Sequence, residues 1–433
     1  MDRSLRAVLF GTFALRFATG LTGAMLSAYL AKLAIAGTAA IDSKTVGLLA
    51  ATFFVAELAL SPLFGVLSDR WGHRRVMLYG PVFGAAAVLL MTLTANLGIL
   101  GGARLLQGAS TAASIPSILG FIAVATAGNE VLRGKASARF EGATLAGLGA
   151  GFILATKAFE IFGTAAFVLN AGIYVVAFLI YFFGVRETAE TVAIRATAPV
   201  SLKRYLELVG HSHVLLLAPT WIAVNAAIGL WFSQSLYQFN KADPHFPDQW
   251  LLQGFSPNQI TVGAIVIAIV FGAGIWWWGN RFDRFRRTSI ILFGVLGGLA
   301  LVGAGLVVNH GAGSAGSSIA VGAVVAAAVV VVGGGLFVLA GATPAAVGLL
   351  ADVSERFPAD RGAIMGLYSV FLGIGQIGGS LIGGVAADWR GMDGLLLGTG
   401  ALLLVALIPL ARLRGLEHHL GPGAPSTLGD VEA

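Results

Sequence analysis

Ionisable side chains inside long apolar segments are the residues of this sequence that point most directly to chemistry. The main examples are Arg16, Glu57, Arg104 and Glu141. A charge at the centre of a bilayer costs at least about 2.5 kcal/mol on insertion scales, so each of these residues needs a partner or a water-filled cavity. We therefore expect them to bind protons or substrate.

Arg16 and Glu57 are predicted to lie at similar depths. Arg16 is about ten residues into its segment at about 1.5 Å per residue, which places it near mid-membrane. Glu57 lies twelve residues before Asp69, which ends the next segment. The pairing predicts that Glu57 takes up and releases a proton, while Arg16 tunes its pKa or holds an anionic group of a substrate. A structural ion pair between helices is the alternative.

Other polar residues have weaker assignments. Glu141 is either a second proton site or a structural carboxylate between helices, and Lys157 and Glu160 are most simply an ion pair at the outer rim. The further candidates for substrate contact or a cavity wall are Arg104, Gln107, Asn225, Trp231 and Gln376. The ionisable residues within apolar segments all fall in the first half, so we expect the titratable chemistry there.

The elements that position these residues follow from composition. Hydrophobic residues make up 57% of the 433 residues and charged residues 11%, whereas a soluble domain carries about 25% charge. A membrane-spanning helix needs roughly 20 apolar residues. Such segments occur at about 5–31, 45–68, 75–95, 98–126, 138–161, 164–185, 213–236, 258–279, 288–308, 318–350, 361–386 and 393–412. We expect bends at Pro116 and Pro344, because proline interrupts helical hydrogen bonding.

This pattern predicts an all-α membrane protein with 12 transmembrane helices in two pseudo-symmetric six-helix bundles. The predicted parts are an N-terminal bundle (1–185), a cytoplasmic linker (186–212), a C-terminal bundle (213–412) and a disordered cytoplasmic tail (413–433). With the N-terminus in the cytoplasm, twenty of the 27 Lys and Arg residues fall in cytoplasmic segments and five on the opposite side. This positive-inside bias places both termini in the cytoplasm.

A short charged signature repeats along the chain. It runs from Gly65 to Arg75 between the second and third segments, and a shortened copy runs from Gly279 to Arg287 between the eighth and ninth. The fifth and eleventh segments also correspond, since Gly147 and Gly151 precede Gly375 and Gly379 by 228 residues. Small residues four apart allow helices to approach closely. The agreement indicates a duplicated six-helix unit.

The doubled signature, together with Arg104-x-x-Gln107-Gly108, resembles the major facilitator superfamily over about residues 5–412. The resemblance implies a central cavity that opens alternately to each side, with the signature as a latch on the cytoplasmic side. The latch residues it implies are Gly65, Asp69, Arg70, Gly72, Arg74, Arg75, Asp283 and Arg284. Two features depart from the family: the second copy is shortened, and the glycine-rich fifth segment lacks the proline common in drug–proton antiporters.

These observations predict a secondary active transporter, proton-coupled, that exports an amphiphilic or drug-like molecule. The alternatives are a proton-coupled importer of a small polar or anionic nutrient, a lipid flippase and a non-transporting membrane receptor. With no Cys, nucleophile triad or phosphate-binding motif in the sequence, we expect no enzyme activity, metal or cofactor. The expected partners are the lipid bilayer, a small-molecule substrate and protons, with no nucleic acid. We expect the protein to be a monomer in the cell inner membrane.

Overall fold

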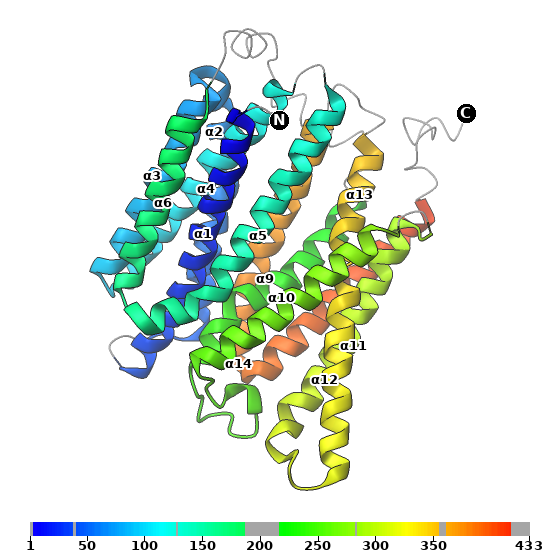
Figure 1. Cartoon of the computed structure of the whole chain (residues 1–433). Helices are drawn as coiled ribbons and strands as arrows, with labels where there is room; N and C mark the ends of the chain where they lie inside the picture. Colours follow the sequence, from blue (N-terminus) through cyan, green and yellow to red (C-terminus); the bar gives the residue numbers. More distant parts are fainter. Residues whose placement is uncertain are drawn as a thin grey trace. The chain divides into compact units, whose positions relative to one another are not determined.

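The structure is a computed structural model that describes residues 3–37, 40–126, 129–186, 216–281, 284–354 and 361–416. The regular elements of this part of the chain are helices (Figure 1). Ten helical segments within it are long and apolar enough to cross a membrane. The predicted all-helical membrane class is therefore confirmed for the described residues. Asp283, most of the predicted linker and most of the predicted tail lie outside them.

The chain forms two compact units. The first contains α1 to α6 and the beginning of α10, up to Ala264. Its helices are α1 (Arg3–Ile35), α2 (Ser43–Trp71), α3 (His73–Leu93), α4 (Leu97–Ala125), α5 (Glu130–Phe162) and α6 (Ala165–Gly184). The signature glycine Gly72 separates α2 from α3 at a φ of 106°, a conformation that glycine adopts without a steric penalty. The sharp turn between these helices therefore depends on this residue.

The second unit contains α9, the rest of α10, and α11 to α14. Its helices are α9 (Ala218–Asn240), α10 (Pro257–Gly279), α11 (Arg287–Gly311), α12 (Ile319–Leu339), α13 (Ala342–Ser354) and α14 (Arg361–Leu416). Two short 3₁₀ turns, η2 (Trp250–Leu252) and η3 (Ala312–Ser314), lie in the connections. Non-helical backbone at Arg390 and Gly391 divides α14, where the sequence predicts a gap between two segments.

The two prolines behave differently. The predicted tenth segment is interrupted between Leu339 and Ala342, shortly before Pro344, so it consists of α12 and α13. By contrast, α4 continues as one helix through Pro116 to Ala125. Membrane helices tolerate proline where neighbouring groups satisfy the freed backbone carbonyl.

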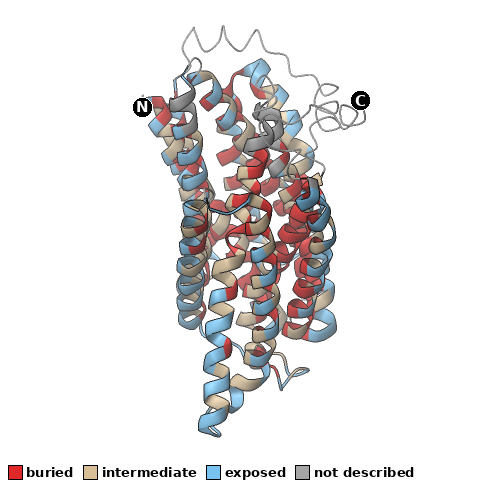
Figure 2. Cartoon of the chain, turned by 90° about the vertical axis from the view of Figure 1, so that its right-hand side faces the viewer, coloured by how far each residue is buried: buried red, intermediate tan, exposed pale blue. Residues whose placement is uncertain are grey.

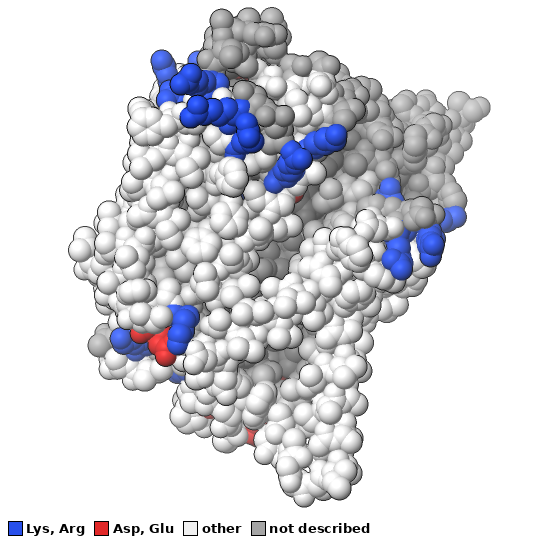
Figure 3. All heavy atoms as spheres, viewed as in Figure 1, with Lys and Arg blue, Asp and Glu red and all other residues white. Residues whose placement is uncertain are grey.

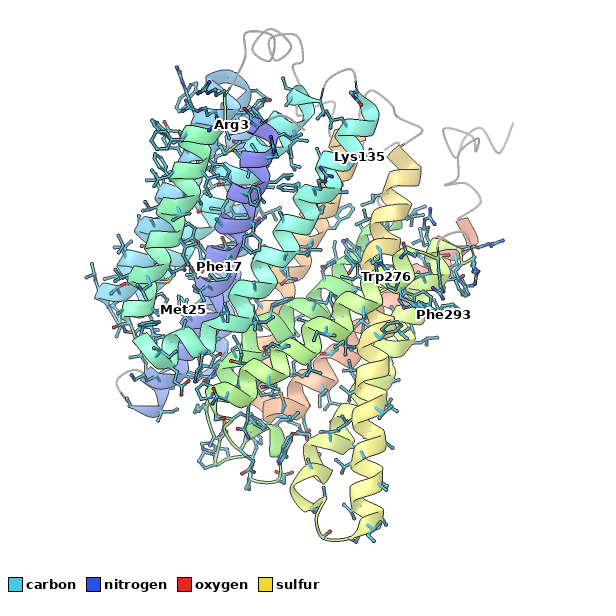
Figure 4. The ribbon with its side chains drawn as sticks, in the orientation of Figure 1. Arg3, Phe17, Met25, Lys135, Trp276 and Phe293 are labelled. Carbon is cyan, nitrogen blue, oxygen red and sulfur yellow. The ribbon has the colours of Figure 1, made fainter. Side chains whose placement is uncertain are left out.

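Equivalent glycine contacts occur within each of the two units. A Cβ on Gly147 of α5 would lie 2.6 Å from the Phe13 carbonyl oxygen of α1, and one on Gly375 of α14 would lie 2.7 Å from the Ile222 carbonyl oxygen of α9. Four residues on, Gly151 meets Phe17, labelled in Figure 4, and Gly379 meets Ala226. Ile222 and Ala226 follow Phe13 and Phe17 by 209 residues in both cases. The predicted small-residue faces are thus confirmed as close helix contacts.

Burial within each unit follows the expected pattern for helices in lipid. Buried residues lie where helices meet, and exposed apolar residues cover outward faces, as Figure 2 shows. On α12, Ile319 and Val330 are 94% and 73% exposed although both are strongly apolar. On the face that Figure 3 shows, most Lys, Arg, Asp and Glu side chains gather toward the ends of the helices, and the surface between them is largely uncharged. An uncharged band of this kind suits the hydrocarbon region of a bilayer.

Candidate functional site

Arg16, Glu57 and Glu141 come together from three helices of the first unit. Arg16 on α1 interacts electrostatically with Glu57 on α2 and with Glu141 on α5. Within the described residues, none of the three side chains makes a salt bridge within 4.0 Å, and the buried Nε of Arg16 has no hydrogen-bond partner. Arg16 thus lies within electrostatic range of Glu57 and of Glu141, without a salt bridge to either among the described residues.

Two glycines hold the backbones that carry these charges. A Cβ on Gly147 of α5 would lie 3.0 Å from the Cβ of Arg16, and one on Gly108 of α4 would lie 3.0 Å from the backbone nitrogen of Glu57. Such distances leave no room for a side chain. Gly147 therefore lets α5, which carries Glu141, approach α1 at Arg16, and Gly108 lets α4 approach α2 at Glu57.

Glu57 and Arg16 are half-buried, whereas Glu141 is exposed. A half-buried carboxylate surrounded by helices can exchange a proton with an adjoining water-accessible space. Arg16 can in turn strengthen its interaction with whichever of the two acids is ionised, since charges attract strongly in a poorly polarisable interior. Two carboxylates within electrostatic range of one guanidinium form an arrangement whose net charge would change on protonation.

Arg104 of α4 is buried and has a different set of contacts. Its Nε donates to the carbonyl oxygen of Leu49 at 3.1 Å, and one terminal nitrogen donates to Oε1 of Gln107. The guanidinium also lies over the ring of Phe53, 4.8 Å from its centroid. Within the described residues Arg104 has no carboxylate partner. It therefore presents a positive charge whose nearest neighbours are neutral.

A network of neutral polar side chains, which the sequence reasoning missed, surrounds Arg104. Gln107 donates to the carbonyl oxygen of Thr19 at 3.3 Å, and the Thr19 hydroxyl lies 3.5 Å from that of Tyr174 on α6. Asn170 of α6 donates to the Thr22 hydroxyl at 2.7 Å, and its own buried Oδ1 has no partner among the described residues. The available signal was polar residues about one helical turn apart within apolar segments, Thr19 and Thr22 on α1 and Asn170 and Tyr174 on α6.

The candidates of the second unit do not form a comparable cluster. Asn225 is buried and donates to Trp221 of its own helix at 2.8 Å. Trp231 donates to the Thr399 hydroxyl at 2.9 Å, and Gln376 packs against Gly229, whose added Cβ would lie 2.8 Å from its Oε1. Trp231 and Gln376 thus join helices inside the second unit, whereas the hydrogen bond of Asn225 stays within α9.

The signature residues are described in part. Asp69, Arg70 and Arg75 are exposed at the junction of α2 and α3, and Arg284 is exposed after α10. Arg74 donates to the Phe182 carbonyl oxygen at 2.6 Å, which joins α3 to α6. Arg3 and Lys135 mark the end of α1 and α5 at which basic side chains gather (Figure 4).

At the other end of α5, Lys157 pairs with Glu160 at 2.6 Å and donates to Asn258 of α10 at 2.8 Å. The ion pair predicted from the sequence is present, and Asn258 is an additional partner. In the second unit, Trp276 of α10 is 71% exposed, and Phe293 of α11 packs against the buried Trp278. Figure 4 labels Trp276 and Phe293. Among the described residues, no group of three or more His, Cys, Asp or Glu could hold a metal ion.

Long apolar helices that hold a few charges in their interior define a multi-pass α-helical membrane protein. A family model described as Major Facilitator Superfamily matches residues 8–349. The chain belongs to this superfamily, and it is a membrane transporter of that family.

Individual relatives and structures agree with this assignment. The chain is 22% identical over 302 residues to quinolone resistance protein NorA of Staphylococcus aureus (strain MSSA476), covering 68% of this chain and 71% of the relative. It is 28% identical over 117 residues to multidrug resistance protein 2 of Bacillus subtilis (strain 168), covering 27% and 29%. The crystal structure of nucleoside transporter NupG matches with a TM-score of 0.68 and 14% identity over 96% of this chain and 99% of that one, which shows the fold alone.

Proposed function

We propose that this transporter exports an amphiphilic or drug-like molecule from the cell in exchange for protons. The names of the two curated relatives concern quinolone resistance and multidrug resistance, which supports export of compounds of this kind. The proposed architecture is twelve membrane helices in two six-helix bundles, with α12 and α13 forming one span and α14 forming two. Both termini are proposed to face the cytoplasm of a bacterium, with the protein in the inner membrane.

One observation carries the proton coupling: Arg16 interacts with two carboxylates and forms a salt bridge with neither among the described residues. A purely structural arginine in a membrane is expected to be fully paired, since an unsatisfied polar group there costs several kcal/mol, about the cost of a lost buried hydrogen bond. The sharing suits a site in which one carboxylate gains a proton and Arg16 moves toward the other.

In the proposed cycle, protonation of Glu57 frees Arg16 to interact with Glu141, and deprotonation restores its attraction to Glu57. In this cycle, binding of the exported molecule near Arg104 and Gln107 favours proton release from Glu57, and by reciprocity protonation of Glu57 favours release of the molecule. Rocking of the two units then exposes the cluster to the other side. The proposed latch at Asp69, Arg70, Arg74 and Arg75 holds the cytoplasmic side shut in one of these states.

Transport into proteoliposomes tests this proposal. With a quinolone as probe, an antiporter accumulates the compound in vesicles whose lumen is more acidic than the medium, whatever the orientation of the protein. A proton symporter accumulates its substrate when the medium is the more acidic side. A radiolabelled nucleoside is tested in the same way as a second probe. Protein-free liposomes control for passive trapping of the quinolone.

The expected result is quinolone accumulation with an acidic lumen, and its collapse when a protonophore removes the gradient. Accumulation only with an acidic medium would indicate that the protein imports its substrate together with protons. Movement of a fluorescent phospholipid without quinolone transport would favour a flippase, and binding without any flux would favour a receptor. Identical quinolone uptake with and without the gradient would exclude proton coupling.

A further inference from the structure

His310 lies between two carboxylates in the second unit. It occupies the end of α11. Its Nε2 is 2.8 Å from Oδ2 of Asp393, just after the break in α14, and its Nδ1 is 3.3 Å from Oδ2 of Asp248, in the loop between α9 and α10. The side chains of Asp393, His310 and Asp248 are 15%, 41% and 67% exposed. One imidazole thus connects three separate segments.

Neutral contacts hold the same loop independently of pH. Oε1 of Gln249 accepts from the backbone nitrogen of Met392 at 2.8 Å, and Asn309 accepts from that of Leu251 at 3.0 Å. Leu252 is buried in an apolar cluster with Met392 and Leu395. These contacts fix where the loop lies, whereas the contact between His310 and Asp248 depends on the proton count of the ring.

Imidazole chemistry makes this contact sensitive to pH. A neutral ring carries one N–H and one lone pair, so it can donate to only one of two carboxylates and turns a lone pair toward the other. The doubly protonated ring donates to both and adds a positive charge between two negative ones. Histidine changes between these forms in the range of about pH 5 to 8.

The other charged side chains of the loop and of α14 contact partners of their own. On the loop, His245 pairs with Asp243 at 2.9 Å, and Lys241 lies over the ring of Tyr237. On α14, Arg390 lies over the ring of Trp389, 5.0 Å from its centroid. The short helices η2 and η3 carry no charged residue. Asp248 and Asp393 are therefore the carboxylates that His310 bridges.

We propose that His310 is a pH-sensitive clasp that, when doubly protonated, ties the loop between α9 and α10 to the break in α14. Loss of one proton releases Asp248 and loosens the loop over a cavity of about 450 Å³, lined by Pro247, Asp248, Trp250, Gln253, His310 and Gly313. In the proposed orientation the loop faces the outside, so the clasp responds to external pH. It closes under the acidic conditions in which an inward proton gradient is largest.

Hydrogen–deuterium exchange of the full-length protein in detergent tests the clasp. The exchange of amides in residues 241–256 is compared between His310→Gln and wild type at about pH 5.5 and at about pH 8.5, on either side of the range in which imidazole changes charge. Comparing two proteins at one pH removes the intrinsic pH dependence of exchange. We expect exchange in the variant to be about two- to fivefold faster at the acidic pH, the range for a partly exposed ion pair. At the alkaline pH the ratio is expected to be near one.

His245→Gln is the matched control, because His245 lies on the same loop and pairs with an aspartate of that loop instead of with another segment. It is expected to leave the ratio near one at both pH values. Asp248→Asn, which changes an exposed side chain, is expected to reproduce the acid-specific loosening even if His310→Gln fails to fold. Equal ratios at the two pH values in the clasp variants, or the same acid-specific effect in His245→Gln, would overturn the proposal.

Discussion

Arg16 shares its charge between Glu57 and Glu141, and the competition between these two acids is the basis of the proposed proton coupling. Arg104 differs from Arg16 because its partners are neutral: a carbonyl oxygen, an amide and an aromatic ring. The two arginines therefore suit different tasks. Arg16 can respond to protonation, while Arg104 keeps its charge available to a negatively polarised group of a substrate.

Replacing Glu57 by Gln is expected to abolish gradient-driven accumulation while leaving substrate exchange across the membrane intact. Gln keeps the size of the side chain but cannot ionise, so the transporter no longer moves protons. Glu160→Gln is the matched control, because Glu160 pairs with Lys157 away from the cluster. Uptake into proteoliposomes with and without a pH gradient measures both quantities. Normal accumulation by Glu57→Gln would remove Glu57 from the coupling mechanism.

The charged members of the site could be predicted from the sequence, and the neutral members could not. Arg16, Glu57 and Arg104 stand out because a charge inside an apolar segment is rare and costly. Thr19 and Asn170 do not stand out, since small polar residues also satisfy the backbone of their own helix. Depth along a helix follows from residue counting, but weakly amphipathic segments do not reveal which face of a helix meets which neighbouring helix. Glu141 remained ambiguous for that reason.

At the scale of helices, pairs of glycines determine how closely the charged helices approach. The α1–α5 contact of the first unit and the α9–α14 contact of the second are built alike, with glycine against a backbone carbonyl in both. In the first unit, Arg16 lies at this contact. The same packing feature that joins two helices therefore sets the spacing of the charged cluster.

Gly147→Ala is expected to destabilise the protein by about 1–3 kcal/mol, the usual cost of overpacking. The new methyl group would lie 2.6 Å from the Phe13 carbonyl oxygen and would push α5 away from Arg16. Gly149→Ala is the control on the same helix, since nothing lies within 4 Å of its added Cβ. The pair Gly379→Ala and Gly378→Ala repeats the comparison on α14. Thermal unfolding in detergent measures all four, and equal effects within each pair would contradict the assignment.

The start of α2 gives a pH-dependent prediction outside the membrane segments. Burial acts to raise the pKa of the N-cap residue Asp42, but hydrogen bonds from Thr45 outweigh it, and Lys44 adds to the net lowering. A lowered pKa in the folded state contributes stability above the unfolded pKa, and that stability is lost as the pH falls through the folded pKa. Asp42→Asn keeps the cap without the charge.

Wild type is therefore expected to be slightly more stable than Asp42→Asn at neutral pH, with the difference disappearing in acid below the pKa of Asp42. Asn96, the uncharged N-cap of α4, shows that Asn can perform the same capping. Thermal unfolding of both proteins across pH provides the measurement. A constant difference at every pH would mean that the charge of Asp42 does not contribute.

Helix positions were largely predictable because long apolar runs leave few alternatives in a membrane protein. The gap predicted between 386 and 393 corresponds to the break at Arg390 and Gly391 in α14. The interruption between α12 and α13 was less accurately placed, since it precedes Pro344, where proline was expected to bend the helix. Proline removes a hydrogen bond to the preceding turn, so its effect falls N-terminal to the residue itself.

At the scale of the whole molecule, the two units share a packing plan and differ in chemistry. The candidate proton site lies in the first unit, whereas Asn225, Trp231 and Gln376 of the second are neutral. The glycine contacts match between the two units, as a duplicated unit predicts. The charges are not duplicated, and this suits a transporter whose coupling resides in one unit while the other supplies an apolar and aromatic wall.

The family and the membrane class could be predicted because composition and a doubled motif depend on the chain alone. Substrate and direction could not, since relatives of one fold transport different molecules. The clasp at His310 was also beyond sequence reasoning, because its three residues come from segments up to 145 positions apart, from Asp248 to Asp393. Isolated histidines and aspartates in loops give no signal until the fold brings them together.

Proton release on substrate binding tests the central claim most directly. A quinolone that the wild-type protein transports is added to the protein in weakly buffered detergent solution, and a pH indicator reports the protons released. We predict release from wild type and from Glu160→Gln, and none from Glu57→Gln, because substrate and proton compete through the cluster at Arg16. Equal release from wild type and Glu57→Gln, or binding to wild type without any release, would contradict the account.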